Sequence, residues 1–195
     1  MVKEMPQALW PPVPVTDTPM DKYRAHINTK FHQRLTDTKE LQRWTVDYQQ
    51  DFYMDLYSYI GLVPALPPSM KRAYDESLPM SSVPPFFEGH CINYTENALF
   101  ANPEDSAIAV VGVRESDDLD KYDGEQVTWK ELHERVRRVA SALKRRGIKQ
   151  GDRVAALVSN SVWAVVLFHA TAAIGAIFTS INPDLGIEVS GSSAT

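Results

Sequence analysis

The 195-residue sequence contains a single cysteine, Cys91, so no disulfide can form within the chain. A disulfide-free chain is typical of a reducing compartment, and we expect a buried, inert thiol. Positive charge is also scarce, because 20 Lys and Arg stand against 25 Asp and Glu and leave a net charge of −5. A surface that binds nucleic acid needs a basic excess, so we expect no nucleic acid partner.

Long apolar runs are missing too. The N-terminus has no sustained apolar stretch of the kind that a secretory signal requires, and we expect a cytoplasmic protein. The longest apolar run, residues 162–178, is just short of a membrane span and contains His169, Thr171 and Gly175. It follows a strand-like stretch and a Ser-Asn-Ser turn, so we interpret it as a buried helix of an α/β core with no membrane contact.

Motifs for cofactors and metals are likewise sparse. The G-x-G-x-x-G pattern of dinucleotide-binding folds is absent, and the five histidines are scattered singly, with no Cys or carboxylate at metal-ligand spacing. We therefore predict no metal site, and we interpret each histidine as a surface residue or a core residue with its hydrogen bonds satisfied.

Proline and glycine divide the sequence into unlike halves. Eleven of the 13 prolines lie at or before Pro85, and eight of the nine glycines follow it. The first half alternates Pro-rich connectors with helical stretches. Over residues 37–60, apolar residues recur at three- and four-residue steps, which indicates one helix or two end to end with an aromatic face. We interpret this face as packing against the following domain, the alternative being a ligand site.

The second half predicts a buried strand over residues 106–114, a short strand at Gln126 and Val127, and then a helix. Thr128 and Glu131 have the spacing of a capping box, and the basic residues before Gly147 suit the end of a helix. We interpret those basic residues as complementing the helix dipole, with a phosphate site as the less favoured alternative.

A strand–helix–strand pattern completes the second half, with strands over residues 153–158 and 176–181 and a helix over 161–173. Such a crossover makes the strands parallel, so their carboxyl ends share one edge of the sheet. Ligands bind at that edge in α/β folds. The loops near Asn160 and residues 180–183 are therefore the candidate binding site.

Particular strings carry more information than these periodicities. The sequence contains, in this order, ALWPPVPVTDTPMDKYRAHI, LQRWTVDYQQDFYMDLYSYIGLV, SVPPFFEGHCINYTENAL, and a long segment from TWKELHERVRR to TSINPDLG. The most specific element is Gly89 with Asn93, Tyr94, Glu96 and Asn97. These strings resemble successive segments of the acyl-adenylate-forming ligases, and among them the acetoacetyl-CoA synthetases, over about residues 9–186.

The resemblance implies an α/β fold. A helical, proline-rich N-terminal extension over residues 1–85 is followed, over 86–186, by the first βαβ part of an adenylate-forming domain. That domain has a mostly parallel sheet, which is incomplete here. Residues 187–195 form a divergent tail: SGSSAT resembles the start of the family's phosphate loop, but no Pro-Lys follows. A working phosphate loop is the less favoured alternative.

The resemblance also implies a reaction that joins a carboxylate, acetoacetate or a related short oxo-acid, to CoA with ATP and Mg²⁺. No residue matches the family's ATP-binding loop or catalytic lysine, so we assign no catalytic residue and expect the chain to be inactive by itself. Ser180, Ile181 and Asn182 are the expected CoA- or nucleotide-facing loop. The alternatives are a non-catalytic binding or regulatory remnant, which associates with the full-length ligase through a bare sheet edge, and a truncated gene model.

Overall fold

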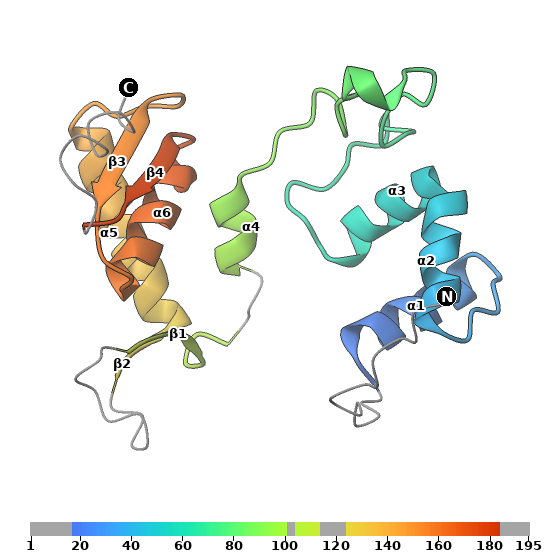
Figure 1. Cartoon of the computed structure of the whole chain (residues 1–195), viewed down its shortest axis with the longest axis horizontal. Helices are drawn as coiled ribbons and strands as arrows, with labels where there is room; N and C mark the ends of the chain where they lie inside the picture. Colours follow the sequence, from blue (N-terminus) through green and yellow to red (C-terminus); the bar gives the residue numbers. More distant parts are fainter. Residues whose placement is uncertain (1–16, 101–103, 114–123, 184–195) are drawn as a thin grey trace, which may run out of the picture. The chain divides into compact units, whose positions relative to one another are not determined.

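The computed structural model describes residues 17–100, 104–113 and 124–183 (Figure 1). The chain divides into two compact units: residues up to Ile60 together with Leu66–Glu88 form the first, and Gly61–Ala65 together with residues from Gly89 onward form the second. The first unit is helical, and the second combines helices with two small sheets.

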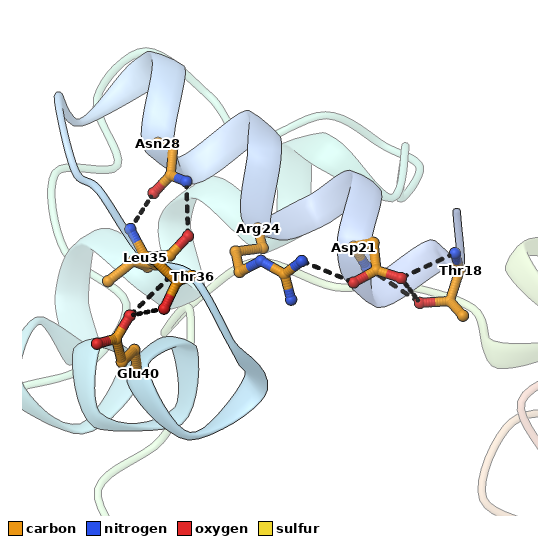
Figure 2. Close-up of polar contacts among 7 residues, drawn as sticks. All are labelled: Thr18, Asp21, Arg24, Asn28, Leu35, Thr36 and Glu40. Carbon is orange, nitrogen blue, oxygen red and sulfur yellow. Dashed lines mark hydrogen bonds and ion pairs between the residues drawn. The ribbon is translucent and has the colours of Figure 1, made fainter. Parts of the chain in front are cut away.

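The first unit consists of α1 (Pro19–Lys30), α2 (Thr38–Asp47), α3 (Gln49–Tyr59) and the short 3₁₀ turn η1 (Met80–Ser82). A capping box starts α1, because the Asp21 amide donates to the Thr18 hydroxyl (3.2 Å) and the Thr18 amide donates to the Asp21 carboxylate (3.1 Å). Figure 2 shows this box together with the ion pair from Arg24 to Asp21 at 2.8 Å. These bonds satisfy amide groups that the first turn leaves without partners.

A side-chain amide holds the connection between α1 and α2. Asn28 donates to the Leu35 carbonyl at 2.9 Å and accepts from the Leu35 amide at 2.8 Å, as a neighbouring strand would do (Figure 2). Glu40 then accepts from the Thr36 amide at 2.7 Å, at the start of α2. The connection is therefore fixed by local polar contacts of side chains with the backbone, without regular secondary structure.

The aromatic face over residues 37–60 is formed by two consecutive helices, α2 and α3. Tyr48 is the non-helical residue between them. The buried members of this face, Leu41 and Trp44, pack with Tyr23 and Ile27 of α1 inside the first unit. The prediction that this face packs against the following domain was therefore wrong. Hydrophobic periodicity identifies which face of a helix is buried, and it carries no information on which segment covers that face.

The second unit consists of α4 (Tyr94–Phe100), β1 (Ile108–Gly112), β2 (Glu125–Thr128), α5 (Trp129–Arg145), β3 (Arg153–Leu157), α6 (Val162–Ala173) and β4 (Ile177–Ile181). β1 and β2 pair antiparallel, whereas β3 and β4 pair parallel with α6 as their crossover. The strand–helix–strand prediction is thus confirmed.

The core of the second unit lies between α5 and α6. It comprises Leu99, Val127, Leu132, Val136, Val162, Val166 and Ala170. The predicted capping box starts α5, because the Glu131 amide donates to the Thr128 hydroxyl (3.3 Å) and the Thr128 amide donates to the Glu131 carboxylate (2.9 Å). Val162, Val166 and Ala170 of this core belong to α6, and β4 follows α6. The apolar run over residues 162–178 is thus a core helix followed by the start of a strand, as predicted.

Two sequence predictions of burial in the second unit were wrong. β1 was expected to be a buried strand, but Ile108 and Val111 are half exposed. The pairing with β2 is irregular between Ile108 and Val110, and only Ala109 and Val110 pack against the core. Cys91, expected to be buried, is exposed in the irregular segment before α4. Among the described residues, no helix is both long and apolar enough to cross a membrane.

Candidate functional site

The carboxyl ends of β3 and β4 meet at one edge of the second unit. The strands run in parallel register, with Leu157 opposite Ile181, and the Val158 amide donates to the Ile181 carbonyl at 3.3 Å. This last bond holds the two chain segments together as they leave the sheet. The loops that follow the strands are therefore brought side by side, as the sequence predicted for a parallel crossover.

These two loops line a pocket of about 550 Å³. The lining residues are Val158, Ser159, Asn160, Ala164, Ser180, Ile181, Asn182 and Pro183. All three residues predicted from the sequence are present, together with Asn160. Sequence reasoning did not single out Val158, Ser159 or Ala164 as site residues. Ala164 lies in the first turn of α6, directly after the Ser-Asn-Ser turn, and that position would have marked it as a neighbour of the loop.

The three predicted site residues have different environments. Ile181 is buried, whereas Ser180 and Asn182 are exposed. Because side chains alternate across a strand, Ile181 anchors the end of β4 in the protein while its neighbours present polar groups. Ser180 and Asn182 therefore bring polar groups to the rim of the pocket, and the buried Ile181 side chain fixes the end of β4.

The amino end of α6 closes one side of the pocket. Its capping residue, Ser161, makes no side-chain capping bond, although the Ala164 amide donates to the Ser161 carbonyl at 3.0 Å. The described lining contains hydroxyl, amide and aliphatic groups and no Lys, Arg, Asp or Glu. This arrangement can bind a neutral polar or aromatic group, but its described lining holds no His, Lys or carboxylate that could act as a general acid or base.

The histidine of α6 belongs to the scaffold. The Thr95 hydroxyl donates to the His169 carbonyl at 3.0 Å and lies 3.3 Å from His169 Nδ1. Burial lowers the pKa of His169, so the ring is neutral at pH 7. This confirms the interpretation of His169 as a satisfied core histidine.

Two sequence predictions concern residues 184–195, which lie outside the described residues: the divergent tail and the phosphate-loop alternative for SGSSAT. Within the described residues, no group of three His, Cys, Asp or Glu side chains is arranged to hold a metal ion.

Comparison with known proteins first gives the class. The family model described as AMP-binding enzyme matches residues 98–189, which include α5, β3, α6 and β4. The α/β pocket described above thus lies within a segment that is similar to AMP-binding enzymes.

Individual proteins that are similar to this chain give a narrower group within the AMP-binding enzymes. Acetoacetyl-CoA synthetase of Macaca fascicularis is 35% identical over 185 residues, which are 93% of this chain and 26% of the relative. Malonamoyl-CoA synthetase of Penicillium aethiopicum is 32% identical over 189 residues, covering 93% of this chain and 25% of the relative. The structure of acetoacetyl-CoA synthetase from Streptomyces lividans matches with a TM-score of 0.71 and 28% identity, over 86% of this chain and 25% of that one.

This chain is therefore a homologue of the acetoacetyl-CoA synthetases, as its motifs indicated, and its α/β class is confirmed. It spans about a quarter of the length of these relatives.

The pocket suits some cosubstrates of such enzymes better than others. Its volume and its mixed polar and apolar lining fit a nucleobase or the amide-rich arm of CoA. It does not fit Mg²⁺ or a triphosphate, because the described lining offers neither carboxylates for the metal nor cations for the phosphates. No chemical step involving the metal can therefore be assigned to these residues.

Proposed function

We propose that this chain is the N-terminal part of an AMP-forming acetoacetate–CoA ligase and that the pocket at the ends of β3 and β4 contacts CoA or the nucleotide. The observation that carries this proposal is the placement of Ser180, Ile181 and Asn182. They line a pocket at the ligand-binding edge of a parallel βαβ unit, in a chain homologous to acetoacetyl-CoA synthetases.

The proposed ligase reaction has two steps. A carboxylate oxygen attacks the α-phosphorus of ATP and pyrophosphate leaves; the CoA thiol then attacks the acyl carbon and AMP leaves. Both steps develop negative charge on phosphate oxygens, which requires cations placed in advance. The pocket of this chain supplies neutral donors and acceptors only, so its part is to bind and orient one cosubstrate.

Two relatives constrain the acyl substrate. One is named for acetoacetyl-CoA and the other for malonamoyl-CoA. Both acyl groups are short and carry a second carbonyl two carbons from the thioester carbonyl. We propose that the carboxylate is acetoacetate or a related short oxo-acid with this 3-carbonyl.

We expect the 195-residue polypeptide to bind CoA or the nucleotide without catalysing the ligase reaction. We expect no acetoacetate-dependent release of pyrophosphate from it, because no residue of the sequence matches a catalytic lysine or a phosphate loop ending in Pro-Lys. The check is a coupled pyrophosphate assay, with an acetoacetyl-CoA synthetase as the positive control. Release of pyrophosphate above background would contradict the proposal.

Filling the pocket tests its role directly. We expect CoA to bind the chain in a calorimetric titration, and Ala164→Phe to weaken that binding at least about tenfold, because the ring occupies space next to Asn160 and Ser180. Trp163→Phe is the matched control: it changes an exposed neighbour outside the pocket and should leave the affinity unchanged. Equal affinities for the two variants would remove the pocket from the proposal.

A second candidate function is a non-catalytic subunit that associates with the full-length ligase. It is favoured by the exposure of two large apolar side chains on the parallel strands, Leu157 (62% exposed) and Ile177 (55%). We expect the chain to co-elute with purified acetoacetyl-CoA synthetase in size-exclusion chromatography, and the double variant Leu157→Lys/Ile177→Lys to elute alone. Separate elution of the unaltered chain would exclude this candidate.

A further inference from the structure

Asn93 lies immediately before α4 and contacts the ends of two helices at once. Its Nδ2 donates to the carbonyls of Ala172 (3.1 Å) and Ala173 (3.3 Å) at the carboxyl end of α6. Its Oδ1 accepts from the Glu96 amide (3.1 Å) in the first turn of α4. One half-buried side chain therefore caps α4 at its start and α6 at its end.

Asn97, one turn later in α4, fixes the segment that enters the second unit. It accepts from the Val63 amide at 2.8 Å and donates to the Val63 carbonyl at 2.9 Å, the arrangement that Asn28 makes with Leu35. It also donates to the Asn93 carbonyl at 3.0 Å. The two asparagines thus join Gly61–Ala65, α4 and α6 through side-chain amides.

The end of α6 determines where β4 begins. After Ala173 the chain turns at Gly175, whose φ of +72° favours glycine, and β4 then runs from Ile177 to the pocket residues. The Gly175 carbonyl accepts from the Gly151 amide at 3.0 Å, just before β3. A shift of the end of α6 would consequently move the start of β4 against β3.

We propose that Asn93 is a positioning residue for the pocket: by holding the Ala172 and Ala173 carbonyls it sets the placement of β4, and with it Ser180 and Asn182. Asn97 supports it by fixing α4 to the Val63 segment. This inference rests on the proposed function only in taking CoA as the ligand. The positioning itself stands on the hydrogen bonds alone.

Asn93→Asp separates the two capping roles. A carboxylate still accepts from the Glu96 amide, so α4 keeps its cap, but it cannot donate and it faces carbonyls at the negative end of α6. We expect amide hydrogen exchange at pH 7 to become about tenfold faster over residues 174–182, with α4 and β1 unchanged, and the CoA dissociation constant to rise by a similar factor. Glu96→Gln, on the exposed side of α4, is the control and should change neither.

A pH profile separates positioning from general loss of structure. At about pH 4, the introduced carboxyl group takes up a proton. It can then donate to the Ala172 carbonyl, as the Asn93 amide does in the unaltered chain. We expect the difference in normalised exchange between Asn93→Asp and the unaltered chain to shrink as the pH falls through this range. A pH-independent difference, or faster exchange spread over the whole second unit, would overturn the positioning role. If exchange responds as expected and the unaltered chain does not bind CoA, only the proposed function fails.

Discussion

Leu132→Ala is expected to lower the free energy of unfolding of the second unit by about 2–5 kcal/mol, because the change removes a buried side chain and leaves a cavity between α5 and α6. Leu132 is 2% exposed and lies in the core with Val136 and Val166. The loss is large for this unit, since two-stranded sheets have little stability of their own and depend on the helices packed against them. Hydrogen exchange with mass spectrometry measures it: amides of α5 and α6 lose protection while those of α2 and α3 keep theirs.

The control uses the same chemical change at an exposed site. Leu157→Ala removes a leucine that is 62% exposed and should cost well under 1 kcal/mol. Equal losses at Leu132 and Leu157 would mean that the core between α5 and α6 does not stabilise the unit. Loss of protection in α2 would mean that the two units unfold together.

Sequence reasoning predicted those parts of the fold whose causes are local. The capping box of α5 depends on Thr128 and Glu131, three residues apart, and both hydrogen bonds form. The parallel pairing of β3 and β4 follows from the length of the intervening helix, and the pocket follows from that pairing. For the same reason the sequence alone places Ser180, Ile181 and Asn182 at one edge of the sheet.

Contacts between distant residues could not be predicted in this way. Asn97 binds Val63 across 34 residues, and His26 binds Asp55 across 29. Neither pair has a spacing that hydrophobic periodicity or capping rules recognise, because each depends on how separate helices pack. The half exposure of Ile108 and Val111 was missed for a related reason: an apolar strand pattern does not say how many of its faces are covered.

The largest electrostatic effect is expected where the first unit buries a carboxylate. The Asp55 side chain is 2% exposed; Lys30 donates to it at 2.6 Å, and His26 Nε2 lies 2.9 Å away. Both partners come from α1, so the cluster joins α1 to α3. Burial raises the pKa of Asp55, but the hydrogen bonds from Lys30 and His26 outweigh burial and hold it below 3.8. The contacts of Asp55 with Lys30 and His26 therefore stabilise the first unit above pH 3.8. This stabilisation is lost as the pH falls through the lowered pKa of Asp55.

Removing both hydrogen-bond partners of Asp55 should reverse this dependence on pH. In the double variant His26→Phe/Lys30→Met, the carboxylate stays buried beside the Tyr23 hydroxyl, whose own pKa burial and the Asp55 charge already raise. We expect a loss of about 3–5 kcal/mol at pH 7. Burial alone then raises the pKa of Asp55 above 3.8, so the free energy of unfolding should increase as the pH falls from that raised pKa toward 3.8.

The reference for this measurement is the same double variant with Asp55→Leu, which has no charge left to bury. Apolar replacements of a buried ion pair are often neutral or stabilising, so most of the lost stability should return at pH 7. Urea unfolding of the two variants from pH 7 to pH 4 is followed by the fluorescence of Trp44, with the other three tryptophans replaced by Phe in both. The difference between the two variants isolates Asp55, because it cancels the titration of every other carboxylate. A difference that stays constant with pH would show that the carboxylate is solvated in the double variant. The contacts of Asp55 with Lys30 and His26 would then contribute little beyond surface attraction.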